Sequence, residues 1–186
     1  MSEVAGETLR LARDSTDECR RLTVSRRADH FVILVDGARL VHRQQRFAAT
    51  HDPGMILRSF VDAEMLGRSA FVDVVFTKWD VVLTSPAAAE VEEFVAAFAE
   101  KTRLHCEARV GRLRFFRVAV RPARGAPVAY GHGLDELFVS WVEASAAFVR
   151  APVDPIPMPE GASEFDRYLW RRLPALRPRE PAGARR

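Results

Sequence analysis

The hydrophobic positions along the chain follow two alternating patterns. Mostly apolar runs occur at residues 29–37, 71–76 and 113–120, and the first contains Phe31-Val32-Ile33-Leu34-Val35. Such short runs, bounded by turn residues, predict strands that are buried on both faces. Between them, apolar residues recur at helical spacing over residues 7–28, 54–67, 85–98 and 134–149. The alternation predicts an α/β fold, a parallel sheet with flanking helices.

The pattern also divides the chain. Residues 1–149 are expected to form the α/β domain. Residues 150–173 are expected to form a proline-rich linker and a short C-terminal helix, since Phe165, Tyr168 and Trp170 recur at helical spacing. Residues 174–186, rich in proline, arginine and alanine, are predicted to be a disordered basic tail.

Composition narrows the class of protein. The chain has 186 residues and is 48% hydrophobic, which is enough for one ordinary core. Its 28 basic and 25 acidic residues leave a net charge of +3, a weak signal that makes nucleic acid an unfavoured partner. Cys19 and Cys106 are isolated, which argues against a structural metal and fits a reducing cytoplasm. The apolar runs are too short to span a membrane, and the polar N-terminus shows no signal peptide.

One tetrapeptide carries the most specific chemistry. Thr77-Lys78-Trp79-Asp80 ends the second apolar run, and Lys78 is one of only two lysines, with Lys101, in an arginine-rich chain. An aspartate carboxylate can accept hydrogen bonds from guanine N1–H and the N2 amino group together. Adenine offers neither donor there, so it would leave the carboxylate unpaired. The aliphatic part of a lysine can meanwhile lie over the base while its ammonium stays hydrated.

This motif and its surroundings resemble the C-terminal two-thirds of a P-loop GTPase domain, and most closely the bacterial double-GTPase family of the translation-factor-related class. The resemblance extends from Gly6 to Val149. It includes Val35-Asp36-Gly37 at the end of the first run, Val118-Ala119-Val120-Arg121 at the end of the third, and Gly131-His132-Gly133 before the last helix. It implies that Asp80 specifies guanine, Lys78 packs on the base and Thr77 braces the loop. The loop at Ala119 would then donate a backbone N–H to guanine O6.

The departures from the family are equally informative. The sequence has no Gly-x-x-x-x-Gly-Lys-Ser/Thr, the motif that cradles phosphates and holds Mg²⁺. Where the family has the aspartate of Asp-x-x-Gly, a metal-associated position, Glu3 precedes Val4-Ala5-Gly6. The chain is therefore expected to be either truncated or degenerate. It would use GTP or GDP with Mg²⁺ only where the missing phosphate-binding half is supplied, and would not hydrolyse GTP alone.

Two alternatives remain open. The chain could be a non-enzymatic protein-interaction module with a relic guanine motif, or a nucleic-acid binder that uses its arginines. In a Ras-like sheet, the strand at Phe31 to Val35 would lie beside the missing first strand. It would then be an exposed edge, open to the N-terminal segment, a partner protein or self-association.

Overall fold

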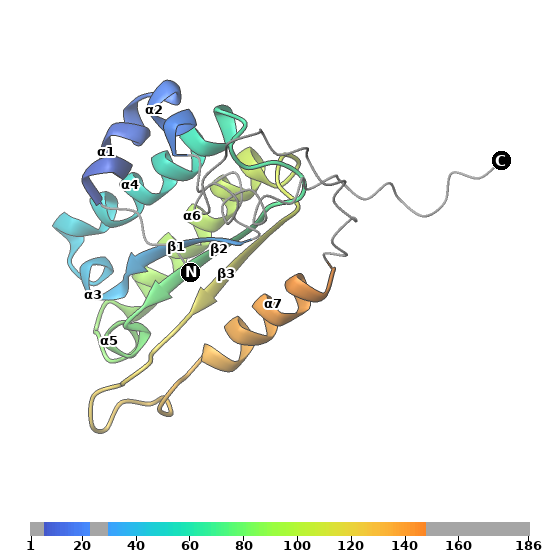
Figure 1. Ribbon diagram of the computed structural model, residues 1–186. Helices are drawn as coiled ribbons and strands as arrows, with labels where there is room; N and C mark the ends of the chain where they lie inside the picture. Colours follow the sequence, from blue (N-terminus) through green and yellow to red (C-terminus); the bar gives the residue numbers. More distant parts are fainter. Residues whose placement is uncertain (1–5, 23–29, 148–186) are drawn as a thin grey trace, which may run out of the picture. The chain divides into compact units, whose positions relative to one another are not determined.

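A computed structural model describes residues 6–22 and 30–147 of the chain (Figure 1). The chain divides into two compact units, Met1–Ser145 and Ala146–Arg186, and the sheet belongs to the first. The expected linker, C-terminal helix and basic tail lie outside the described residues, as does Glu3. In chain order the elements are α1 (Gly6–Asp14), α2 (Thr16–Arg21), β1 (His30–Asp36), α3 (Gly37–Leu40), α4 (Arg43–Asp62), β2 (Phe71–Thr77), α5 (Trp79–Leu83), α6 (Ala88–Cys106), β3 (Arg112–Arg117) and α7 (Leu134–Ala147).

The three strands form one parallel sheet in the order β1-β2-β3. The predicted α/β architecture is thus confirmed, and each apolar run contains a strand, although β3 ends at Arg117 and leaves residues 118–120 of the third run outside it. The central strand β2 is buried along both faces, whereas β1 is buried only at alternate positions. Because β1 pairs with β2 alone among the described residues, its outer edge has no strand beside it there.

Helices cover the two faces of the sheet unequally. On one face, side chains of β1 and β2 such as Ile33, Val35 and Val74 pack with residues of α4 and α6. On the other face, Val75 and Phe116 pack against α7 through Leu137 and Trp141. Buried Asp73 of β2 joins the same layer, since its carboxylate accepts a hydrogen bond from the Trp141 indole at 2.9 Å. A single described helix therefore shields this second face.

Helix α4 departs from the sequence prediction. The helix predicted to begin at residue 54 begins earlier, and α4 runs without interruption from Arg43 to Asp62 with Pro53 inside it. Proline removes a backbone donor and usually kinks a helix. Tertiary packing outweighs that cost here: Gly54 lets α4 approach α6 so closely that an added Cβ would lie 3.3 Å from the Phe98 ring. The glycine that suggested a turn is a packing residue.

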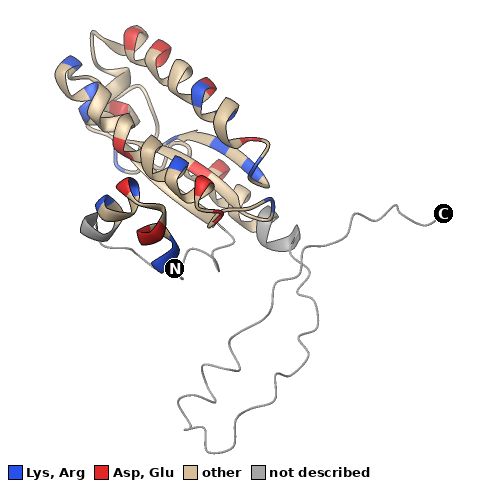
Figure 2. Cartoon of the chain, turned by 90° about the horizontal axis from the view of Figure 1, so that it is seen from above, with Lys and Arg blue, Asp and Glu red and all other residues tan. Residues whose placement is uncertain are grey.

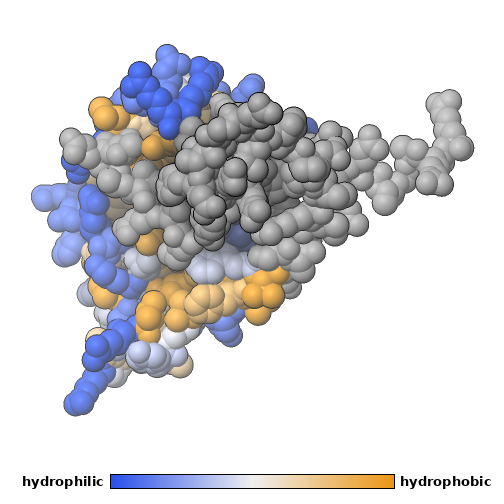
Figure 3. Space-filling model, in the orientation of Figure 1, coloured by the Kyte–Doolittle hydropathy of each residue, from blue (hydrophilic) through white to orange (hydrophobic). Residues whose placement is uncertain are grey.

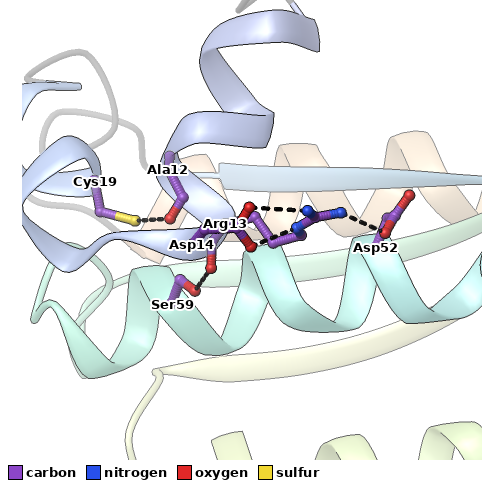
Figure 4. A network of polar contacts seen from close by, with 6 residues as sticks. All are labelled: Ala12, Arg13, Asp14, Cys19, Asp52 and Ser59. Atoms are coloured by element: carbon purple, nitrogen blue, oxygen red, sulfur yellow. Dashed lines mark hydrogen bonds and ion pairs between the residues drawn. The ribbon is translucent and has the colours of Figure 1, made fainter.

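The N-terminal helices are fastened to α4 by polar contacts (Figure 4). The Arg13 guanidinium pairs with Asp52 at 2.9 Å, and the Ser59 hydroxyl donates to the Arg13 carbonyl at 2.7 Å. The Cys19 thiol donates to the Ala12 carbonyl at 2.8 Å and joins α2 to α1. The helix expected over residues 7–28 is thus two helices on the described part, with Ser15 capping the second.

Charge is distributed over the helices without a dominant sign. Basic and acidic positions are interspersed in Figure 2, and several are paired, as in Arg46–Glu90 at 2.6 Å and Arg117–Glu92 at 2.7 Å. None of the described helices combines the length and the apolar character needed to cross a lipid bilayer.

Candidate functional site

The motif residues gather at the carboxyl edge of the sheet. Parallel strands all end at the same edge, so Asp36 at the end of β1, Thr77 at the end of β2 and Val118 after β3 become neighbours. The Thr77 hydroxyl donates to the Val35 carbonyl of β1 at 3.3 Å, which fits the bracing role predicted for it. An added Cβ at Gly37 would overlap the Thr77 carbonyl oxygen, so only glycine permits this approach of the two turns.

Lys78 occupies an unusual backbone conformation. It is left-handed, with φ 52° and ψ 41°, and glycine residues aside it shares a positive φ only with Glu64 among the described residues. Its ammonium donates to the Asp36 carboxylate at 2.9 Å, while the side chain as a whole is 58% exposed. The other Asp36 oxygen accepts from the Ala38 amide at 3.0 Å and caps α3. The Asp36 carboxylate therefore both caps α3 and orients the Lys78 side chain.

Asp80 is the most enclosed polar residue of the motif. It lies in the first turn of α5 and is only 7% exposed. Its carboxylate accepts a hydrogen bond from the backbone N–H of Ala123 at 3.1 Å. The neighbouring Trp79 amide donates to the Val118 carbonyl at 3.1 Å and ties α5 to the segment after β3. The carboxylate thus faces the loop between β3 and α7, on the same side as the Ala119 segment.

Ala119 directly precedes the loop that contacts the Asp80 carboxylate, but its backbone N–H already has a hydrogen-bond partner. The residue is 1% exposed, and its N–H donates to the His132 carbonyl at 3.0 Å in an isolated antiparallel bridge. The next residue, Val120, is 51% exposed. Contact between guanine O6 and a backbone N–H of this segment remains a prediction, and it would require Ala119 to exchange its partner or Val120 to act in its place.

Other candidate residues take structural roles. Cys106 is buried, and burial raises the pKa of its thiol to about 11, so it is no thiolate beside His105. Asp52 pairs with Arg13, and the His51 ring stacks on Phe47. Within the described ranges, no three histidine, cysteine, aspartate or glutamate side chains gather as a metal site.

Two arginines of β3 make contacts with neighbouring elements. Arg112 donates to the Ser140 hydroxyl of α7 at 2.8 Å and lies over the Phe71 ring. Arg117 pairs with Glu92 and lies 5.2 Å from the centre of the Trp79 ring. Both arginines therefore have structural partners, although the Arg117 side chain is 42% exposed.

Comparison with known proteins places this geometry in a family. The family model described as Double-GTPase 2 matches residues 1–142. The chain belongs to the double-GTPase 2 family. Neither the curated proteins nor the solved structures contain a match to it. Membership confirms the family recognised from Thr77-Lys78-Trp79-Asp80 and relates this double-GTPase domain to GTPases and guanine nucleotides in general.

Sequence reasoning missed two members of the site. Asp36 caps α3 and also holds the Lys78 ammonium. The positions of Asp36 and Lys78 at the ends of two neighbouring strands were a usable signal, because such ends converge in a parallel sheet. The Ala123 amide carries no signal of its own, since a backbone donor is available at any residue other than proline.

Proposed function

We propose that this double-GTPase domain binds guanine nucleotides through its base-reading half. Asp80 would accept from guanine N1–H and N2–H, Lys78 would pack along the base, Thr77 would brace the turn, and the segment at Ala119 would approach O6. The observation that supports this most strongly is the enclosed Asp80 carboxylate at the edge of the sheet. Asp80 is 7% exposed, and its carboxylate is hydrogen-bonded to the loop that follows Ala119.

The same proposal limits the activity of the isolated chain. Its 186 residues contain no Gly-x-x-x-x-Gly-Lys-Ser/Thr, so the usual backbone cradle, lysine and Mg²⁺ hydroxyl ligand for the phosphates are not encoded in it. We expect weak GDP binding and no turnover of GTP by this polypeptide alone, because phosphoryl transfer depends on positioning and charge neutralisation at the γ-phosphate. Efficient binding with Mg²⁺ would require phosphate-binding residues from elsewhere.

Isothermal calorimetry with GDP and ADP at high concentration tests base recognition. Heat is expected with GDP only, and Asp80→Ala should weaken GDP binding at least tenfold, because it removes charge-assisted hydrogen bonds of about 1.5–3 kcal/mol. Asp80→Asn supplies a gain of function: its amide can donate to the C2 carbonyl of xanthine, so the preference should move from GDP to xanthosine diphosphate. Equal binding of GDP and ADP would contradict the proposal.

A second function, protein interaction through β1, is supported by a separate observation. Leu34 is 66% and Val32 38% exposed on β1, which among the described residues pairs with a strand on one side only, and α1 and α2 pack on α4. Exposed apolar residues of α7, Phe138, Val139 and Val142, add an apolar band visible in Figure 3. An unpaired apolar edge readily accepts a strand from a partner or a second copy.

Light scattering on a sizing column tests this second function. Leu34→Lys should abolish any self-association or strand-mediated complex, since it places a charge on the edge strand. Leu104→Lys is the matched control, because Leu104 is 82% exposed on α6. A wild-type protein that stays monomeric at all concentrations, and whose partners bind Leu34→Lys unchanged, would contradict it.

A further inference from the structure

The two groups expected to read guanine are both bonded to one loop of the chain itself. This loop, residues 120–132, connects the segment after β3 to α7. The Ala123 N–H donates to the Asp80 carboxylate at 3.1 Å, and the His132 carbonyl accepts from the Ala119 N–H at 3.0 Å. Asp80 and Ala119 are both buried in this arrangement.

The polarity of these bonds corresponds to that of guanine. The base presents an N–H donor at N1 beside a carbonyl acceptor at O6, and a carboxylate with a neighbouring backbone N–H complements that pair. The loop offers the same pair, a donor to Asp80 and an acceptor to Ala119. An adenine edge has the opposite polarity at both positions, so the loop satisfies these groups in the way that guanine, and not adenine, would.

The loop is held mainly by its backbone. Most of its side chains are exposed, and Tyr130 is 76% exposed. Backbone hydrogen bonds within the loop stabilise it: the Ala126 N–H donates to the Ala123 carbonyl at 3.1 Å, and the Gly131 N–H donates to the Val120 carbonyl at 3.1 Å. Gly125 and Gly131 have φ of 81° and 74°, values that glycine adopts readily. A segment with few buried side chains opens at a lower free-energy cost than the core.

We propose that the 120–132 loop is an autoinhibitory element that occupies the guanine-reading groups, and that guanine binds by displacing it. This rests on the proposed function, since it concerns the same site. The apparent affinity for guanine nucleotide is then reduced by the fraction of molecules in which the loop is closed. A change that weakens the closed loop, without touching Asp80, raises the affinity.

The decisive variant is Ala123→Pro, which removes the one N–H that the loop donates to Asp80. It should bind GDP roughly tenfold more tightly than the wild type in calorimetry, the factor that corresponds to losing one hydrogen bond to a charged group. Ala123→Ser keeps the backbone donor and is the matched control, with wild-type affinity. Most disruptive substitutions near a binding site weaken binding. A gain in GDP affinity would therefore distinguish displacement of the loop from a local disruption of the structure.

A second variant weakens the closed loop by another route. Gly131→Ala strains a residue with φ 74°, while its Cβ would meet nothing closer than a Leu134 methyl at 3.8 Å. It should also tighten GDP binding, whereas Gly67→Ala, which has open space around it, should not. Amide hydrogen exchange at Ala123 supplies an independent readout: the wild-type amide should be protected without nucleotide and exchange faster when GDP is bound.

The outcomes distinguish the two proposals. GDP-specific binding that depends on Asp80, with Ala123→Pro and Gly131→Ala no tighter than wild type, would overturn the autoinhibitory loop and leave guanine recognition standing. Absence of GDP binding in the wild type and in both variants would overturn both. Binding that appears or strengthens only when the loop is weakened would support both.

Discussion

Asp36 and Gly37 show how two adjacent residues can organise a site that lies forty residues away in sequence. The carboxylate holds the Lys78 ammonium at 2.9 Å, and the glycine admits the Thr77 carbonyl where any Cβ would overlap it. Lys78 is thereby kept in a left-handed conformation that a lysine seldom adopts. Such a conformation persists only where neighbouring groups determine it, and here they lie at the Thr77–Asp80 motif.

Gly37→Ala should therefore be strongly destabilising for its size. We expect a loss of about 2 kcal/mol in the free energy of unfolding, the usual cost of forcing an extra methyl group into a packed site. Urea unfolding followed by circular dichroism measures it. Gly67→Ala, with no atom within 4 Å of the added Cβ, is the control and should be nearly neutral. A tolerated Gly37→Ala would mean that the two turns are not in contact.

At the scale of elements, the sequence predicted what depends on periodicity and missed what depends on packing. The three apolar runs form β1, β2 and β3 because an unbroken apolar run is compatible with few other environments. The start of α4 was predicted too late, at residue 54, because the contacts of α4 with α1 and α6 keep the segment around Pro53 helical. The left-handed Lys78 and the Ala123 amide were beyond reach, since both depend on contacts between distant segments.

The Arg46 side chain of α4 joins this helix to both α3 and α6. It is 6% exposed, donates to the Leu40 carbonyl at the end of α3 at 2.7 Å, and pairs with Glu90 of α6 at 2.6 Å. Arg46→Ala leaves that buried carbonyl without its donor, and we expect a loss of about 2–3 kcal/mol in urea unfolding. Arg58→Ala removes an exposed pair with Asp62 and should cost less than about 1 kcal/mol. Similar costs for the two variants would contradict this role of Arg46.

At the scale of the whole molecule, the two faces of the sheet differ in how much they bury. The face under α4 and α6 contains two apolar clusters, and both cysteines lie in one of them. The face under α7 contains a smaller one. The reactivity of the two thiols therefore reports whether this larger core is folded, because a buried thiol reacts only when solvent reaches it.

Both thiols should be inert in the folded protein. Cys19 and Cys106 are buried, and burial raises the pKa of each, to about 11 for Cys106. Ellman's reagent at about pH 8 should label almost no thiol in the native state and both after denaturation. Because the folded pKa of Cys106 exceeds its ordinary value of 9.0, stability should also fall as the pH rises from about 9 toward 11. Rapid native labelling would show that this core is open.

Trp79 has a consequence of a practical kind. Its indole is 2% exposed, it stands between Lys78 and Asp80 in the chain, and the Arg117 guanidinium lies over its ring. Indole emission responds to nearby charge and to the entry of water, so a rearrangement at this edge of the sheet alters its intensity and wavelength. Trp79 is thus an intrinsic fluorophore inside the Thr77–Asp80 motif, and nucleotide titrations can be followed through its fluorescence without any label.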